Sequence, residues 1–151
     1  MQEQNKIVAR IVENLISLDE IYISVNSFKN GAQVLFFGTV RNHNDGKAVH
    51  GVSYFAHKSL AERAFIDICN EALEKWGQET NIAILHRVGR LGVGQISIAI
   101  AVGSPHRREA YQVSRYLIEQ LKIRAPIWKK EHYESGESEW LQGHALCAHS
   151  A

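Results

Sequence analysis

Two lysines, Lys122 and Lys129, have the types and spacing that could support chemistry. Lys122 ends a helical pattern, and Lys129 follows seven residues later, beyond a turn marked by Pro126, so both ammonium groups could reach one pocket. A lysine that is desolvated among other cations loses part of its affinity for protons, and it can then serve as acid, base or nucleophile. The pair is therefore predicted to lie in a reactive, anion-binding site.

A second basic group stands at the start of the same helix. Ser104 is the expected N-cap and Pro105 the first helical residue, because serine accepts a bond from a free amide and proline needs none there. The first turn then contains His106, Arg107 and Arg108, although a helix N-terminus ordinarily favours acidic residues. A bound anion would explain this composition, since amides and guanidinium groups would converge on it. The alternative is that both arginines extend into solvent.

Positive charge is concentrated in this part of the chain. Residues 104–131 contain seven Lys or Arg and three acidic residues, a net charge of +4, whereas the whole 151-residue chain carries +1. Proteins that bind nucleic acids usually carry a basic field over a large surface, so a small anionic ligand is the better expectation.

Periodicity predicts the elements that position these groups. Helices are expected over residues 17–30, 59–76 and 104–122, the first two beginning with the capping boxes Ser17–Glu20 and Ser59–Glu62. Strands are expected over residues 6–12, 33–40, 49–55, 81–88, 96–102 and 127–133. The pattern predicts an α+β fold of one domain, residues 1–144, with three helices packed on a mixed or antiparallel sheet. Residues 145–151 are expected to be a disordered tail.

Three details of these elements can be predicted as well. Phe28 is expected to be buried with Ile21 and Val25 on one face of the first helix. The continuous apolar run at 33–40 predicts a strand that is covered on both faces. Gly77 is expected to end the second helix in the left-handed conformation.

Strand positions predict where further site residues point. In the last strand, alternation places Lys129 and Glu131 on one face and Lys130 and His132 on the other. Arg41 directly follows the strand at 33–40, where functional side chains commonly emerge. The alternative for Arg41 is a solvated side chain at a strand end.

Other chemistries find little support in the sequence. The eight histidines have none of the spacings typical of metal ligands, and no Gly-x-Ser-x-Gly elbow marks a serine nucleophile. Cys69 falls in a helical pattern and Cys147 in the tail, which argues against a disulfide framework. No long apolar run and no signal-peptide pattern occur, so we expect a cytoplasmic protein without metal or cofactor.

Four motifs resemble the large, catalytic subunit of molybdopterin synthase. They are Phe37-Gly-Thr-Val-Arg-Asn-His-Asn44, His86-Arg-Val-Gly89, Ser104-Pro-His-Arg107 and Leu121-Lys-Ile-Arg-Ala-Pro-Ile-Trp-Lys-Lys-Glu131. The last motif is the most specific, and the resemblance extends from Gly31 to Trp140. It implies a fold of the α/β-hammerhead type and a sulfurtransferase of molybdenum cofactor biosynthesis.

The resemblance also implies a reaction and partners. The family converts cyclic pyranopterin monophosphate into molybdopterin by adding the two sulfurs of a dithiolene. The sulfur arrives on the C-terminal Gly-Gly thiocarboxylate of a small ubiquitin-like subunit. Large subunits form a homodimer within a heterotetramer, and their pockets can draw residues from both large chains. The sequence leaves open which chain supplies Arg41.

Site residues are implied position by position. Lys122 and Lys129 would be catalytic, stabilising the oxyanion formed on release of the acyl group and moving protons as the cyclic phosphate opens. His106 and Arg107 would bind the substrate phosphate, and Arg107 together with Arg41 would hold it in a bidentate grip. The implied substrate-binding residues are Thr39, Val40, Arg41, His106, Arg107, Lys122, Lys129, Lys130 and Glu131.

Two other functions stay open from the residues alone. A non-catalytic phosphate-binding module would lose only ligand affinity in the variant Lys122→Ala. A protein-interaction scaffold would bind an acidic partner in a salt-sensitive way without any small ligand. The chain also departs from the family at one point, because some members have an arginine shortly after the position of Trp140, where Leu141-Gln-Gly-His144 stands here.

Overall fold

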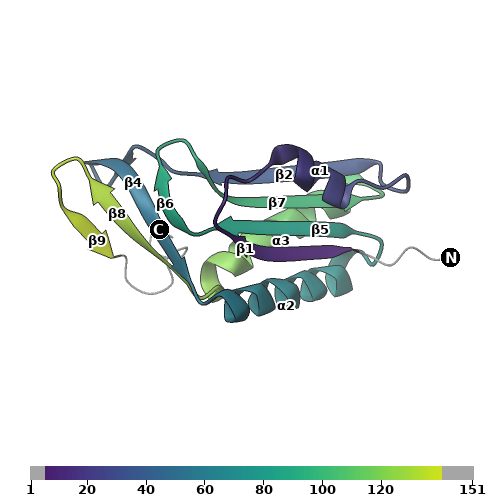
Figure 1. Cartoon of the computed structure of the whole chain (residues 1–151). Helices are drawn as coiled ribbons and strands as arrows, with labels where there is room; N and C mark the ends of the chain where they lie inside the picture. The colour runs from purple at the N-terminus through teal and green to yellow at the C-terminus, as the bar shows by residue number, and fades with distance from the viewer. Residues whose placement is uncertain (1–5, 141–151) are drawn as a thin grey trace.

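The computed structural model describes residues 6–140 as two β-sheets and three helices (Figure 1). In chain order the elements are β1 (Ile7–Val12), α1 (Leu18–Val25), β2 (Ala32–Thr39), β3 (His43–Asn44), β4 (Lys47–Ala56), α2 (Lys58–Trp76), β5 (Asn81–Arg87), β6 (Gly89–Gly92), β7 (Ile96–Ser104), α3 (Arg107–Arg124), β8 (Ile127–Tyr133) and β9 (Ser138–Trp140). Among these residues, no helix is both long and apolar enough to cross a membrane.

The first sheet has the strand order β1-β5-β7-β2, with β1 parallel to β5 and the other pairs antiparallel. Its side chains alternate between two faces. On one face Ile82, Ile84 and Ile100 join the main core, which α2 and α3 cover. On the other face Ala83 and Ala101 pack against α1, because small side chains let this short helix approach closely. Figure 1 shows α1 above the sheet and the two longer helices below it.

The second sheet lies at one end of the first (Figure 1) and is antiparallel throughout. Its strand order is β3-β4-β8-β9, and β6 also pairs with β4. The hairpin from β3 to β4 turns at Asp45 and Gly46, whose φ angles of 49° and 76° suit a tight two-residue turn. The predicted α+β class with three helices is confirmed, with the strands divided between two sheets.

Helix α3 runs the length of the first sheet and packs on β2 and β7. It follows β7 after a short turn and runs back along that strand. Arg107 therefore lies near the end of the sheet where Ala32 pairs with Ser104, and Lys122 near the end where Thr39 pairs with Ile96. Arg107 and Lys122 are 15 positions apart, which corresponds to about 22 Å at about 1.5 Å per residue.

Two predictions about the first two helices are wrong. Helix α1 ends at Val25, and the side chain of Phe28 is fully exposed instead of buried. The Ser17 cap is confirmed, since its hydroxyl accepts a bond from the Glu20 amide. The second capping box does not form, because α2 begins at Lys58 and the side chain of Glu62 accepts a 3.0 Å bond from the Ile11 amide. A tertiary contact with the edge of β1 thus takes the carboxylate that a local cap would have used.

The predicted start of the third helix is also wrong. Ser104 is the last residue of β7, fully buried, with its hydroxyl 3.0 Å from that of Thr80. Pairing with Ala32 keeps Ser104 in the sheet, so α3 begins at Arg107 with His106 as its N-cap.

Two further details differ from expectation. Strand β2 is an edge strand of the first sheet, and Leu35 and Phe36 are exposed, so it is not covered on both faces. Gly77 follows α2 with a φ of 175°, which is extended rather than left-handed. The predicted tail at 145–151, with Cys147, and also His144, lie outside the described residues.

Candidate active site

The centre of the site is a buried ion pair on one face of β8. The Nζ atom of Lys129 lies 3.6 Å from Oε1 of Glu131, and the two side chains are only 17% and 5% exposed. The alternation of the strand, which the sequence predicted, places both on the face toward the interior. A charge pair this far from water needs further polar partners to be stable.

The pKa of Lys129 is lowered, and the causes describe the surroundings of its amine. Burial is the largest cause, because it disfavours the charged form. The negative charge of Glu131, 3.6 Å away, opposes this effect, whereas the positive charges of Arg41 and Lys122 lower the pKa further. The structure therefore brings Arg41, Lys122, Lys129 and Glu131 into one electrostatic environment.

Arg41 is positioned by the residue before it. Val40 is buried in the main core, and both its backbone groups are used: its amide bonds to the Gln95 carbonyl and its carbonyl accepts from Gly94. This anchorage fixes the chain where it leaves β2, so Arg41 emerges as an exposed side chain beside the second sheet. Thr39, the last residue of β2, is exposed as well.

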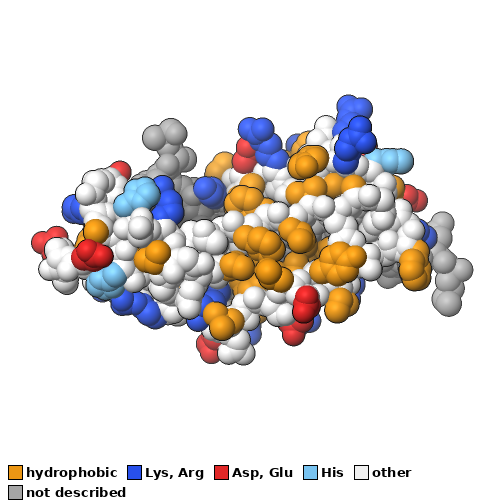
Figure 2. Space-filling model, turned by 90° about the horizontal axis from the view of Figure 1, so that it is seen from above, with side chains coloured by type: hydrophobic (Ala, Val, Ile, Leu, Met, Phe, Trp, Pro, Cys, Tyr) orange, Lys and Arg blue, Asp and Glu red, His pale blue; other side chains and the backbone are white. Residues whose placement is uncertain are grey.

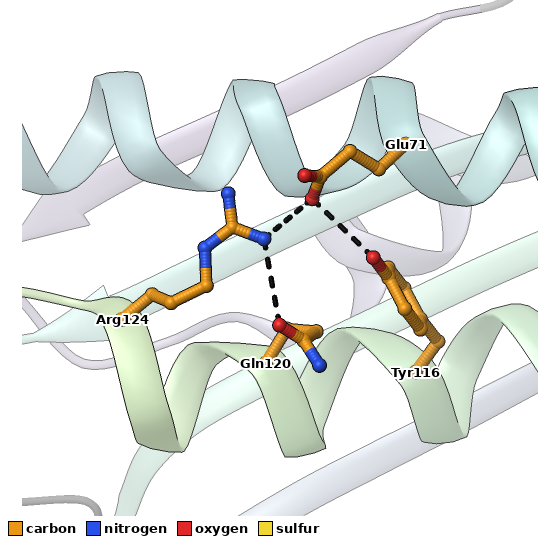
Figure 3. A network of polar contacts seen from close by, with 4 residues as sticks. All are labelled: Glu71, Tyr116, Gln120 and Arg124. Carbon is orange, nitrogen blue, oxygen red and sulfur yellow. Dashed lines mark hydrogen bonds and ion pairs between the residues drawn. The ribbon is translucent and has the colours of Figure 1, made fainter.

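Lys122 is exposed on the last turn of α3, and a polar network ties this turn to α2 (Figure 3). Glu71 of α2 accepts a 2.5 Å bond from Arg124 and a 3.4 Å bond from the hydroxyl of Tyr116. Arg124 also donates to the side chain of Gln120. The network fixes the position of the turn that presents Lys122.

Three predicted site residues lie away from this cluster. His106 and Arg107 are exposed at the opposite end of α3, and His106 makes no capping bond with its side chain. Lys130 lies on the other face of β8, with its Nζ 5.5 Å from the ring centroid of Trp140. One chain therefore does not bring the predicted phosphate-binding pair to the two lysines.

Two residues of the cluster were missed by the sequence predictions. Asn44 donates a 2.7 Å bond to Oε2 of Glu131, and the hydroxyl of Tyr133 donates a 3.0 Å bond to the same oxygen. Strand alternation could have found Tyr133, which lies two residues beyond Glu131 on the same face. Asn44 gave no local signal, since it lies 87 residues from Glu131 in the sequence.

Other reactive groups of the described residues do not take part in this site. No group of three or more His, Cys, Asp or Glu side chains within residues 6–140 could hold a metal ion. Cys69 is a fully buried free thiol, and burial raises its pKa to about 12, so it is not a nucleophile near neutral pH. The cluster of lysines and arginine can bind an anion, stabilise an oxyanion and, through the destabilised ammonium of Lys129, transfer a proton.

Comparisons with known proteins agree with this chemistry. The model of the MoaE protein family matches residues 11–124. The molybdopterin synthase catalytic subunit of Nostoc sp. is 45% identical over 126 residues, covering 83% of this chain and 76% of that protein. The human subunit of the same name is 39% identical over 147 residues, covering 97% and 77%.

Solved structures agree as well. The crystal structure of molybdopterin synthase from Staphylococcus aureus matches with a TM-score of 0.84 at 38% identity, covering 90% of this chain and 97% of that one. The resemblance found in the sequence motifs is thus confirmed over most of the chain. The chain belongs to the MoaE family, the catalytic subunits of molybdopterin synthase, and acts as a sulfurtransferase in molybdenum cofactor biosynthesis.

Proposed function

We propose that Arg41, Lys122, Lys129 and Glu131 form the pocket in which sulfur passes from a small ubiquitin-like subunit to cyclic pyranopterin monophosphate. The observation that carries this proposal is the buried pair of Lys129 and Glu131 on β8, whose lysine lies within the electrostatic influence of Arg41, beyond β2, and Lys122, on α3. Such a pocket suits two anionic reactants, a thiocarboxylate and a phosphate. A solved Helicobacter pylori structure that shares the fold is described as a complex of subunits 1 and 2 of molybdopterin-converting factor.

The chemistry assigns distinct roles to the two lysines. The thiocarboxylate sulfur attacks a substrate carbon that is esterified to the cyclic phosphate. A C–S bond then joins the small subunit to the substrate, while the C–O bond to the phosphate breaks and the phosphate oxygen takes the electron pair. Water then attacks the acyl carbon, the acyl C–S bond breaks, and the small subunit leaves as a carboxylate while the sulfur stays on the pterin. Lys122 stabilises the oxyanion of this second step, and Lys129 transfers protons as the cyclic phosphate opens.

The phosphate site is proposed to require a second copy of the chain. His106 and Arg107 lie about 22 Å along α3 from Lys122, too far to share a ligand with it inside one chain. Edge strand β2 joins the two regions, and among the described residues it pairs only with β7. Two copies associated antiparallel along β2 would bring Arg107 of one copy to the Arg41 end of the other. We propose this homodimer, with one small subunit at each pocket, in the cytoplasm.

The first experiment is a single-turnover reaction with a thiocarboxylated small subunit and the cyclic precursor. The wild type should form product, and Lys122→Ala should lose activity by about 10²-fold or more while the complex still assembles. Lys58→Ala, at an exposed site on α2, is the matched control and should keep full activity. No product from an assembled wild-type complex would contradict the proposal.

A mixing experiment tests the shared pocket. Arg107→Ala and Lys122→Ala homodimers should each be inactive, but exchange of their subunits creates mixed dimers with one intact pocket. Activity should therefore return to about a quarter of the wild-type level when equal amounts are mixed, as random exchange between two-fold dimers requires. If both residues act within one chain, no exchange restores activity.

A further inference from the structure

The carboxylate of Glu131 is held by two residues to which the proposed reaction assigns no part. Oε2 accepts bonds from Asn44 Nδ2 at 2.7 Å and from the Tyr133 hydroxyl at 3.0 Å. Oε1, the other oxygen, lies 3.6 Å from Lys129 Nζ. Glu131 is 3% exposed, so water cannot readily replace a partner that is removed.

The hydroxyl of Tyr133 donates its hydrogen bond to Glu131 and not to Glu139. The same hydroxyl lies 3.1 Å from Oε2 of Glu139, but a phenol has only one proton to donate. Glu139 is exposed and can be solvated by water, whereas Glu131 is buried. The free energy gained from the bond is therefore larger at Glu131.

We propose that Asn44 and Tyr133 are positioning residues, which hold the Glu131 carboxylate with one oxygen toward Lys129 and so fix the place of the Lys129 amine. With Oε2 bound on two sides, the carboxylate cannot rotate without losing both bonds. The other oxygen, Oε1, then provides a fixed partner for the ammonium group of Lys129. The use of this arrangement in sulfur transfer rests on the proposed function, but the arrangement itself can be tested without turnover.

Asn44 has a second effect, because it belongs to the segment that carries Arg41. Strand β3 consists of two residues and pairs only with the start of β4 within the described chain. Strand β4 already pairs with β8, and the bond from Asn44 to Glu131 adds a direct link from β3 to β8. It thereby fixes the distance between Arg41 and the lysine of β8, on which joint binding of one anion depends.

The groups facing Lys129 determine what happens when the carboxylate is released. They are Glu131 on the same strand, Arg41 beyond β2, Lys122 on α3 and Tyr54, which pairs with Lys129 across β4 and β8. Glu131 is the group that raises the pKa of Lys129, against burial and the two cations. If the Glu131 carboxylate rotates away from Lys129, its negative charge no longer balances the charges of Arg41 and Lys122. The pKa of Lys129 should then fall.

The test measures the proton affinity of Lys129 in the large subunit alone. Lysines are ¹³C-methylated by reductive alkylation, the Lys129 signal is assigned with Lys129→Arg, and its pKa is followed by NMR. Tyr133→Phe and Asn44→Ala should each lower the pKa of Lys129 by about half a unit or more. Glu131→Gln, which removes the carboxylate charge itself, should lower it further. In the Glu131→Gln background, Tyr133→Phe should cause no further fall, since both changes act through one carboxylate.

A matched control separates positioning from general stability. Tyr22→Phe also removes a tyrosine hydroxyl, but an exposed one on α1, which packs on β5 and β7 of the first sheet. It should leave the pKa of Lys129 unchanged. An unchanged value in both Tyr133→Phe and Asn44→Ala, or falls that add fully to that of Glu131→Gln, would overturn the proposal. If Tyr133→Phe fails to fold, Asn44→Ala decides the question.

Single-turnover rates then connect the arrangement to the reaction. Tyr133→Phe should slow sulfur transfer by about tenfold without weakening assembly with the small subunit, because a misplaced proton donor affects the reaction step. A lowered pKa with an unchanged rate would leave the positioning of Glu131 intact and instead contradict the role proposed for Lys129.

Discussion

At the scale of single residues, His86 is the most unusual titratable group outside the site. It is fully buried in β5, and its ring packs edge-on against Tyr54 with the centroids 5.0 Å apart. Its Nδ1 lies 2.9 Å from the carbonyl oxygen of Arg87, while Nε2 has no hydrogen-bond partner in the described part of the chain. Burial lowers the pKa of His86 from 6.5 to about 4, so the ring is neutral in the folded protein.

This imidazole predicts a loss of stability in acid. Between about pH 6.5 and pH 4 the unfolded chain takes up a proton that the folded protein does not, so the free energy of unfolding falls as the pH is lowered. The full effect of one such group is about 3 kcal/mol. Urea unfolding should show this loss in the wild type and much less of it in His86→Phe. Parallel pH curves for the two proteins would contradict the prediction, and His43→Phe, at an exposed site, is the control.

The proposed roles of the lysines predict that charge alone is not sufficient at position 129. Lys129→Arg keeps the positive charge, but a guanidinium group does not release a proton near neutral pH. Single-turnover sulfur transfer should fall by about 10²-fold, while affinity for the cyclic phosphate stays within a few-fold of wild type. A variant with near-normal rates would indicate that Lys129 acts only as a fixed charge.

At the scale of elements, α2 and α3 are joined by the network around Glu71 (Figure 3). The side chains of Arg124 and Glu71 are 36% and 39% exposed, so Glu71→Gln should cost only about 0.5 kcal/mol of stability. The larger effect should be local. Amide hydrogen exchange should accelerate in the last turn of α3, which carries Lys122. Glu119→Gln, which breaks the Arg115–Glu119 pair within α3, should leave that turn unchanged.

The elements also explain how far the sequence could predict the fold. The hydrophobic period identified all three helices, because each must bury one face. The ends of the helices were harder to predict, because they depend on contacts with residues far away in the sequence. Ser104 stays in β7 because it pairs with Ala32, and the carboxylate of Glu62 binds the amide of Ile11 instead of capping α2. Within the site, alternation placed Lys129 beside Glu131 correctly. The bond from Asn44 depends on how a distant hairpin folds back, and local pattern carries no information about that.

At the scale of the whole molecule, the two edges of the first sheet differ. The edge at β1 is partly occupied, because Glu62 accepts the outward-facing amide of Ile11. The edge at β2 has no strand partner other than β7 among residues 6–140. Hydrophobic side chains gather over the middle of this sheet when it is seen from above (Figure 2). The difference favours association of two copies along β2.

This surface yields a prediction about assembly. Leu35 of β2 is 42% exposed, and Leu35→Lys should convert the proposed dimer to monomers, because a buried unpaired charge at the interface is costly. Sedimentation velocity measures the change, and Leu60→Lys, at an exposed site on α2, is the control. A Leu35→Lys protein that remains dimeric would locate the interface elsewhere.

The length of α3 has a consequence for how activity depends on the amount of protein. With lysines at one end of the helix and Arg107 at the other, each folded monomer would hold two halves of different pockets and no complete one. Dilution would then lower the rate per chain as well as the total rate, although every chain stays folded. The level of expression would determine which fraction of the chains is dimeric and therefore active. At concentrations near the dissociation constant of the dimer, a small rise in the amount of protein would raise the total activity more than proportionally.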